Sequence, residues 1–407
     1  MDFELREEES IFRNTLREFL DKEIAPIADK RDKKGPLTKE EVIGFYKKFK
    51  KIGLGFDPET AKGWLKNPMF FGIAAEEISR VWASLFAVWG YQVFASLAPL
   101  ASEESAERLL PKLEKAELIG CLAVTEPGAG SDTSKLQTTA TPDGDHYIIQ
   151  GRKCWITNAP IADVALVAAT EKDTGIQNFF FIDREISPFE TTELHKIGWR
   201  AAPTGEMIFD NCRVPKENAL TEMLMKAFTE KEEMRPPLFD PEFGVMKLAT
   251  KMRPLSAIFC LMRTSMALQA TGISQAALDA SLKYAKERVQ FGKPIGRFQL
   301  IQEMLYEMTA IVESSRLLAY RALDAVWKGN PEARKWSSLA KCYACEGCIK
   351  VTYDAIQIHG GIGLSDEYPL ERYFRDARIM TIGDGTTEIQ KMIVGRELLG
   401  KGFSAYT

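Results

Sequence analysis

The sequence predicts an α+β fold in three parts: a helical N-terminal domain, a middle antiparallel β domain and a C-terminal four-helix bundle. Apolar residues recur every three or four positions before residue 118 and again after residue 251, which is the period of amphipathic helices. Between these regions, short β-branched and aromatic runs alternate with turn residues, which is typical of strands. Since 45% of the 407 residues are hydrophobic, the chain can bury a core in each part.

The N-terminal domain, residues 1–118, is expected to be an antiparallel block of helices. The helical period runs through residues 4–28, 38–53, 70–102 and 102–117. Pro26, the pair Gly35 and Pro36, and the segment from Gly53 to Pro58 interrupt this period, as glycine and proline do between elements.

The middle domain, residues 119–215, contains five strand candidates. They lie at residues 118–128, 146–159, 163–171, 178–185 and 205–215, and turn sequences such as "PDGD" separate them. Residues 216–250 form a charged stretch with paired prolines, which favours an extended connection or a lid-like loop over a core element.

The C-terminal domain, residues 251–407, is expected to form the bundle from helices at 253–290, 298–329, 333–361 and 386–402. Within the third helix, Cys342, Cys345 and Cys348 have a spacing known from some iron–sulfur sites. The helical pattern around them and the missing fourth ligand favour the other interpretation, small buried residues at a helix contact.

Composition excludes several classes of partner and compartment. The net charge of −4 leaves no basic surplus for a nucleic acid backbone. No apolar run is expected to reach the ~20 residues of a membrane span. The early acidic residues exclude a secretory signal or an acid-poor transit peptide, and seven cysteines in mostly apolar contexts indicate a reducing compartment. We therefore expect a cytoplasmic protein, or a mature protein whose targeting segment has already been removed.

Four segments carry chemistry when they are taken together. They are "VTEPGAGSD" at 124–132, "WITNA" at 155–159, "ERVQFGKPIGRFQ" at 287–299, and residues 357–390, which begin "QIHGG" and end "GDGTTEIQ". In the first, glycine and serine present backbone N–H groups and a hydroxyl after a strand, which suits an anionic or polar ligand edge. Each segment alone fits an ordinary turn, strand or helix end.

Together the four segments resemble the flavin-binding and catalytic segments of acyl-CoA dehydrogenases, in the same order along essentially the whole chain. The resemblance implies FAD as cofactor and an acyl-CoA substrate. It also implies a homotetramer arranged as a dimer of dimers, and an electron-transferring flavoprotein as electron acceptor.

The resemblance assigns residues of the middle domain to the flavin. Val124 and Thr125 are expected to face its pyrimidine side, and Ser131 to contact the flavin or the CoA arm. Trp155 is expected beside the isoalloxazine ring, with Thr157 near N5. An aromatic residue in a strand is more often part of a core, so the assignment of Trp155 depends on the other segments.

A second set is expected to reach the flavin of a neighbouring subunit. An arginine fork suits pyrophosphate, and glutamine can meet adenine or ribose. By resemblance, this set comprises Arg288, Phe291, Gln299, Gln357, Gly360 and Gly361, and the cofactor-binding residues near the C-terminus are Thr386 and Glu388.

Asp384 is the candidate general base. It stands where most family members have glutamate in a similar "EGT" segment, and removal of a proton next to a thioester carbonyl needs a positioned carboxylate. Some members carry the base at a position that is Met262 in this chain, which cannot serve. Arg263 is expected to brace the site, and Gly385 to contact substrate. The alternatives are that Asp384 only forms a turn before the last helix, or that the chain is a degenerate paralogue.

The shorter carboxylate predicts a compact acyl group, and our prediction is an alicyclic carboxyl-CoA. Tyr91 and Phe94 are expected to contact this group, alongside Phe86 and Trp89 of the same aromatic helix; at helical spacing such residues are also common in cores. A short linear or branched acyl-CoA, a non-dehydrogenating flavin-binding relative of the lyase or desulfinase kind, and a non-catalytic binding protein are the alternatives.

Overall fold

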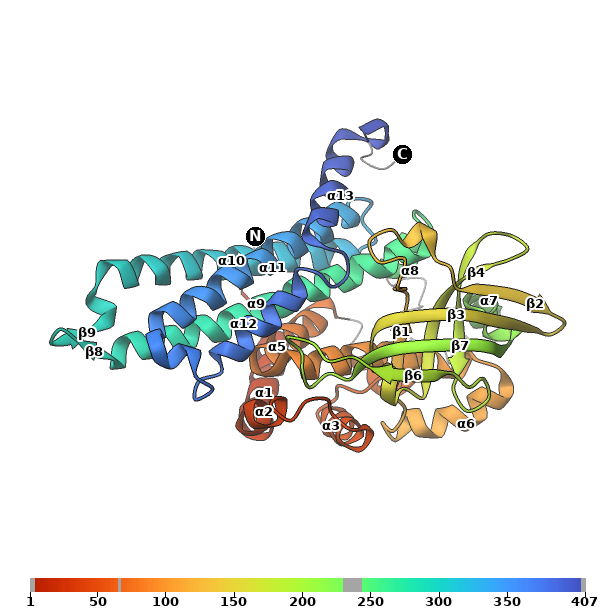
Figure 1. The fold of residues 1–407 in the computed structure, drawn as a ribbon, viewed down its shortest axis with the longest axis horizontal. Helices are drawn as coiled ribbons and strands as arrows, with labels where there is room; N and C mark the ends of the chain where they lie inside the picture. Colours follow the sequence, from red (N-terminus) through yellow and green to blue (C-terminus); the bar gives the residue numbers. More distant parts are fainter. Residues whose placement is uncertain (1–3, 65–66, 230–243, 404–407) are drawn as a thin grey trace.

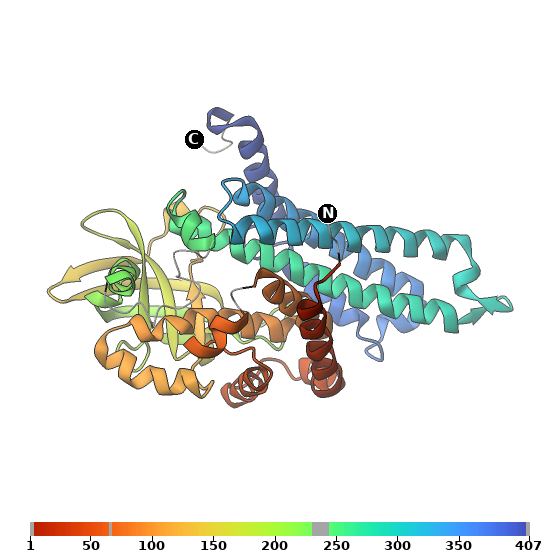
Figure 2. The same ribbon diagram turned by 180° about the vertical axis from the view of Figure 1, so that it is seen from behind.

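The computed structural model describes residues 4–64, 67–229 and 244–403, and it has the three expected parts (Figure 1). The N-terminal helices pack between the sheet and the long helices of the bundle, as the view from behind shows (Figure 2). The helices of this part are α1 (Glu7–Glu23), α2 (Ala25–Asp32), α3 (Lys39–Lys51), α4 (Pro58–Trp64), α5 (Pro68–Gly90), η1 (Tyr91–Leu100) and α6 (Glu103–Glu114).

Local sequence explains where these helices begin. Pro26 lies in the first turn of α2, where proline costs no hydrogen bond. Thr38 caps α3 and exchanges hydrogen bonds with Glu41, whose carboxylate accepts the Thr38 N–H at 2.8 Å. Asn67 caps α5 by accepting the Met69 N–H at 2.9 Å.

The helix formed by α5 and η1 corrects one expectation from the sequence. Among the described residues, Pro68–Leu100 is long and apolar enough to cross a membrane, although no such run was expected. Its most apolar window is 83% buried in the protein, so its apolar surface is used by the core. Close contact with α9 (Pro254–Glu287) depends on Gly272, where a Cβ atom would lie 2.1 Å from the Glu76 carbonyl oxygen.

The middle part is one seven-stranded sheet with the strand order β1-β4-β2-β3-β7-β6, and β5 pairs with β4. Most pairs are antiparallel, as the turns predict, but β1 and β2 both pair with β4 in parallel. The periodicity of the sequence did not reveal β2 and β6, which are short and half-exposed. The strands are β1 (Gly120–Ala123), β2 (Thr139–Asp143), β3 (His146–Thr157), β4 (Val164–Glu171), β5 (Gln177–Asp183), β6 (Glu190–Glu193) and β7 (Thr204–Pro215).

The connection between sheet and bundle is partly helical. The helices α7 (Leu220–Thr229) and α8 (Gly244–Ala249) form where a lid-like loop was expected, because apolar residues recur there at helical spacing. Residues 230–243 of that prediction lie outside the described residues.

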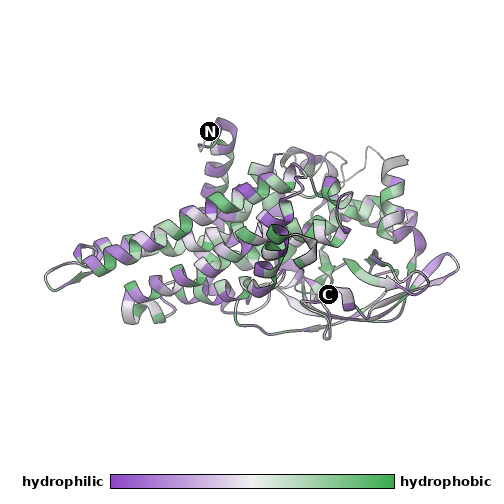
Figure 3. Cartoon of the chain, turned by 90° about the horizontal axis from the view of Figure 1, so that it is seen from above, coloured by the Kyte–Doolittle hydropathy of each residue, from purple (hydrophilic) through white to green (hydrophobic). Residues whose placement is uncertain are grey.

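Long helices dominate the C-terminal part, and hydrophilic and hydrophobic residues alternate along them (Figure 3). Helices α9, α10 and α11 run alongside one another, and α12 lies beside them, whereas α13 projects from the bundle (Figure 1). The expected fourth helix of the bundle is therefore not fully packed in it, and Leu398 and Leu399 of α13 are exposed. The elements are α9 (Pro254–Glu287), β8 (Val289–Gln290), β9 (Lys293–Pro294), η7 (Ile295–Arg297), α10 (Gln299–Trp327), α11 (Ala333–His359), η8 (Gly360–Leu364), α12 (Leu370–Met380), α13 (Thr387–Leu399) and η9 (Lys401–Phe403).

Cys342, Cys345 and Cys348, whose spacing is known from some iron–sulfur sites, lie on α11, which is a continuous helix. Cys345 is fully buried and its thiol lies 4.0 Å from the Met266 carbonyl oxygen of α9. Cys348 is likewise fully buried, and Cys342 is buried in the same helix. These positions have the burial that small apolar side chains have at a helix–helix contact.

Candidate active site

A pocket lies where all three parts of the fold meet, and its empty space, open solvent included, is about 830 Å³. Helices α5 and η1 form one wall, α9 forms another, and Trp199 of the middle domain closes a side. Aromatic and aliphatic side chains dominate the lining. The described residues that line it are Phe56, Phe71, Phe86, Ala87, Trp89, Gly90, Tyr91, Val93, Phe94, Trp199, Val245, Ile258, Leu261, Met262, Ser265, Met266, Gln269, Trp327 and Asp384.

Asp384 is the only carboxylate among the described lining residues. It lies in the turn between α12 and α13 with a left-handed backbone, φ 54°, which aspartate tolerates better than most residues. Gly385 follows at φ 96°, and a Cβ atom there would lie 2.6 Å from the Gln390 Nε2 atom. The sequence Asp-Gly therefore permits a tight turn that brings the carboxylate to the pocket.

Three side chains donate hydrogen bonds to the backbone of this turn. Arg263 donates from Nε to the Asp384 carbonyl oxygen at 3.2 Å. Lys341 donates from Nζ to the Gly385 carbonyl oxygen at 2.8 Å, and Gln390 donates to the same oxygen at 2.9 Å. These donors come from α9, α11 and α13, so three helices fix the position of the candidate base.

The surroundings of Asp384 alter its acidity. Burial raises the pKa of Asp384 to about 6, and the positive charges of Lys341 and Arg263 act in the opposite direction. Burial and the nearby Asp384 carboxylate both raise the pKa of Tyr91, whose hydroxyl therefore stays protonated. A carboxyl group with this pKa is mostly ionised at neutral pH and can accept a proton.

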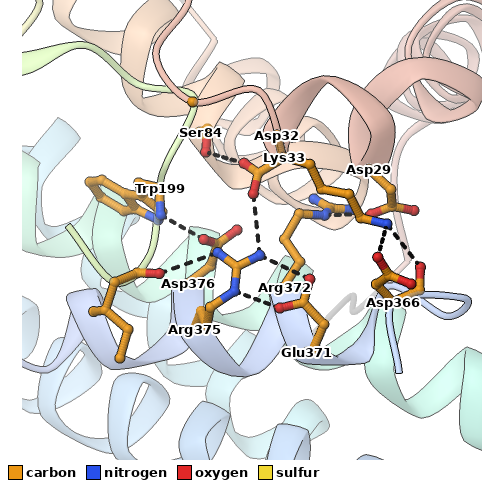
Figure 4. A network of polar contacts seen from close by, with 12 residues as sticks. Asp29, Asp32, Lys33, Ser84, Trp199, Asp366, Glu371, Arg372, Arg375 and Asp376 are labelled. Atoms are coloured by element: carbon orange, nitrogen blue, oxygen red, sulfur yellow. Dashed lines mark hydrogen bonds and ion pairs between the residues drawn. The ribbon is translucent and has the colours of Figure 1, made fainter. Parts of the chain in front are cut away.

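Helix α12, which leads into the turn, is anchored to the other two parts by a polar network (Figure 4). The Trp199 backbone N–H donates to Asp376 at 2.6 Å, and Arg372 donates to Asp29 at 2.7 Å. Arg375 donates to Asp32 at 3.3 Å. The network ties the base-bearing turn to the middle domain and to α2.

The sequence-predicted flavin residues of the middle domain lie close together. The Cys154 N–H donates to the Thr125 carbonyl oxygen at 2.9 Å, which holds the beginning of the first motif beside the strand that carries Trp155 and Thr157. Val124 is buried, and its carbonyl oxygen accepts a hydrogen bond from Lys153 at 3.0 Å.

Trp155 has the geometry that a flat aromatic ligand needs. It is 59% exposed although its neighbours Cys154 and Ile156 are buried, and its φ of 62° turns the backbone out of the regular strand. A bulge in the pairing of β3 with β7 accompanies this conformation. An exposed indole beside the hydroxyl-bearing Thr125 and Thr157 fits an isoalloxazine ring. Ser131 is exposed near the end of the first motif.

The second set of flavin candidates lies far from Trp155. The hairpin of β8 and β9 and the end of α11 are at the extremity of the bundle opposite the sheet (Figure 1). Phe291 at the hairpin tip is 92% exposed with φ 50°. The other members are also exposed: Arg288, Gln299, Gln357, Gly360 and Gly361. The structure therefore does not bring the two sets together within one chain.

Two predicted cofactor-binding residues lie at the start of α13, and two residues of the site were not predicted. Thr386 caps α13 by accepting the Ile389 N–H at 3.5 Å, and Glu388 is exposed on the first turn of that helix. Sequence reasoning did not identify Lys341 or Trp199. The signal for Lys341 was a lysine on the small-residue face of "SLAKCYAC", whereas Trp199 lies in a turn that carries no comparable pattern.

Comparisons with known proteins agree with this architecture. Family models for the N-terminal, middle and C-terminal domains of acyl-CoA dehydrogenases match residues 6–117, 121–212 and 254–399. The chain is 37% identical to the mitochondrial short-chain specific acyl-CoA dehydrogenase of Sus scrofa, over 97% of this chain and 91% of that protein. It is 34% identical to the glutaryl-CoA dehydrogenase of Desulfococcus multivorans, over 98% of each chain.

A solved structure extends the comparison to a flavin complex. The glutaryl-CoA dehydrogenase of Mycobacterium smegmatis in complex with FADH2 superposes with a TM-score of 0.80 at 25% identity. The alignment covers 99% of this chain and 97% of that one.

Proposed function

Because the chain belongs to the acyl-CoA dehydrogenase family and is an FAD-dependent oxidoreductase, we propose that it dehydrogenates a compact acyl-CoA thioester with Asp384 as the general base. The observation that carries this proposal is the position of Asp384. It is the only carboxylate among the described residues that line an otherwise apolar pocket.

The chemistry requires a base and an electron acceptor. Bound FAD supplies the acceptor for the hydride that leaves the β-carbon. Asp384 takes the proton from the α-carbon, and its pKa of about 6 makes the ionised form dominant near neutral pH. The apolar lining excludes water, which strengthens the electrostatic effect of each charged group in the pocket.

The middle domain supplies the proposed flavin surface within one chain. Val124, Thr125, Trp155 and Thr157 form it, and Ser131 extends it toward the CoA arm. Exposure of the indole supports this assignment, because a buried core tryptophan would not show 59% of its surface.

The remaining flavin candidates support a proposal about assembly. Arg288, Phe291, Gln299, Gln357 and Gly361 are exposed at the far end of the bundle, so they can serve a flavin only in another copy of the chain. We therefore propose a homotetramer arranged as a dimer of dimers. An electron-transferring flavoprotein is the proposed acceptor of the electrons from the reduced enzyme.

The proposed substrate is an alicyclic carboxyl-CoA. Aspartate is one methylene shorter than glutamate, and reactive geometry is sensitive at about the ångström scale, so a wide acyl group is needed to bring its α-hydrogen to the base. The pocket has an aromatic wall formed by Phe86, Trp89, Tyr91 and Phe94. No lysine, arginine or histidine is among its described lining residues, which disfavours a dicarboxylic acyl group.

An anaerobic titration of the holoenzyme tests the proposal. Cyclohexanecarboxyl-CoA, butyryl-CoA, isobutyryl-CoA and glutaryl-CoA are added separately, and loss of flavin absorbance is followed. We expect bleaching by the cyclic thioester at the lowest concentration. Preferential bleaching by a linear or branched thioester would retain the dehydrogenase and refute the alicyclic assignment, and no bleaching by any of the four would refute the compact-substrate proposal.

A further inference from the structure

Lys341 is a fully buried lysine behind the turn that carries Asp384. Its side chain is 0% exposed on α11, surrounded by small residues of that helix. Its ammonium donates to the carbonyl oxygens of Gly385 at 2.8 Å and Thr381 at 3.3 Å. These two carbonyl oxygens lie on opposite sides of Asp384 in the sequence, so one ammonium group clamps both ends of the turn.

The charge of this lysine has no partner of the usual kind. Among the described parts of the chain, Lys341 forms no ion pair, although a buried ammonium without a counter-charge is costly. Two carbonyl dipoles offset only part of that cost. Asp384 lies within the turn that Lys341 clamps, and each of the two groups favours the charged form of the other, although they form no direct ion pair.

Other groups near Lys341 do not replace Asp384 in this role. On α11, burial raises the pKa of Cys345 to about 12 and also raises the pKa of Cys342, so both thiols stay neutral. On α9, Arg263 has the same sign of charge as Lys341. On α13, Glu388 is exposed, and water and salt screen its charge. On η1, Tyr91 stays protonated.

We propose that Lys341 is a positioning residue for the reaction, which acts through the 381–385 turn to hold Asp384 in place and, together with Arg263, supplies buried positive charge near it. Lys341 does not line the pocket, so it does not contact the acyl group. The inference rests on the proposed role of Asp384 as the base. It adds a second contribution, because hydrogen bonds fix the geometry of the base while the charge favours its ionised form.

Two substitutions separate the hydrogen bonds from the charge. Lys341→Met keeps the length of the side chain and removes both contributions. Lys341→Gln removes the charge and keeps an N–H donor for the Gly385 carbonyl oxygen. Lys391→Met is the matched control, because Lys391 is an exposed lysine on α13 whose ion pair is with Glu346. Asp384→Asn reports on the base itself.

The measurement is anaerobic stopped-flow reduction of the flavin in each holoenzyme between pH 5 and pH 8.5, with the thioester that bleaches the wild-type protein. The limiting rate, the half-saturating thioester concentration and the pH midpoint are compared. Removing a positive charge disfavours the carboxylate, so both Lys341 variants should move the midpoint upward by about one pH unit. Lys341→Met should also lower the limiting rate at pH 8.5 by about 100-fold, as misplaced reacting groups do. The limiting rate of Lys341→Gln should fall by a smaller factor. The half-saturating thioester concentration should stay the same in both variants.

Several results would overturn the inference. An unchanged midpoint in both Lys341 variants would refute the contribution of the charge, and an unchanged limiting rate in Lys341→Met would refute the positioning role. If Lys341→Met does not fold, the midpoint of Lys341→Gln alone decides. The same shift in Lys391→Met would show that the effect is not specific to the buried ammonium. Rapid flavin reduction in Asp384→Asn would instead refute the assignment of Asp384 as the base. If Asp384→Asn is inactive while both Lys341 variants have the wild-type midpoint and limiting rate, only the role of Lys341 is refuted.

Discussion

The acidity of Asp384 leads to a quantitative prediction for the pH dependence of flavin reduction. Burial raises the pKa of this carboxyl group to about 6, despite the opposing charges of Lys341 and Arg263. With that pKa, roughly one molecule in eleven is ionised at pH 5 and roughly ten in eleven at pH 7. The second-order rate constant for reduction, which reports the free holoenzyme, should therefore rise about tenfold between pH 5 and pH 7.

Stopped-flow absorbance under anaerobic conditions measures this constant at low thioester concentration. An aspartate with an ordinary pKa of about 3.9 would be almost fully ionised at both pH values and would give a nearly flat profile. A flat profile would therefore refute the reasoning that burial controls the base. A decrease toward pH 7 would refute the assignment of an ionised carboxylate as the reacting form.

Asp376 provides the matched control for this experiment. Burial and the neighbouring Asp32 raise the pKa of Asp376 to about 7, so this group also titrates in the relevant range. It lies in the anchoring network of α12 and does not line the pocket (Figure 4). Asp376→Asn should keep the rise in rate between pH 5 and pH 7, and loss of the rise would assign it to the network.

Three other predictions follow from buried groups. The raised pKa makes native Asp376 bind a proton that the unfolded chain has lost, so the stability of the wild-type protein should fall as pH rises from about 4 to 7. Asp376→Asn should weaken this pH dependence of the melting temperature between pH 5 and pH 7. An equal slope in both proteins would contradict the link between protonation of Asp376 and stability. Lys153→Met removes the ammonium group that lies 2.7 Å from the buried Glu126 carboxylate. It should therefore lower the free energy of unfolding in urea titrations by about 3–5 kcal/mol and weaken FAD binding. An unchanged unfolding midpoint would refute the predicted loss of stability. Phe86→Ala should enlarge the pocket and shift the ratio of rate constants for hexanoyl-CoA over cyclohexanecarboxyl-CoA upward by about tenfold, and a constant ratio would place Phe86 outside the acyl site.

The sequence predicted the order of the three parts because helical and strand periodicity are local properties. It did not predict the parallel pairing of β1 and β2 with β4, which depends on contacts between residues distant in the chain. It also treated α13 as a bundle helix, since an apolar pattern does not tell which surface will cover it. Leu398 and Leu399 are exposed in the described chain.

In the candidate site too, the sequence predicted local features and missed contacts between distant residues. Asp384 could be identified from its local sequence, because the Asp-Gly pair marks a turn and the surrounding segment resembles a known one. Lys341 lies more than 40 positions earlier, and its relation to the turn exists only after α11 packs against it. Trp199 enters the pocket from a turn of the middle domain for a similar reason, since Asp376 of α12 holds its backbone N–H.

The central claim is that Asp384 removes the proton that allows flavin reduction, and one measurement tests it most directly. The Asp384→Asn holoenzyme is mixed anaerobically with the thioester that bleaches the wild-type protein, after its visible spectrum has shown that FAD is bound. The account predicts bound flavin, retained thioester binding and a rate of bleaching at least about 1,000-fold lower than that of the wild-type protein. Bleaching at a rate close to the wild-type rate would contradict the account and require a different base.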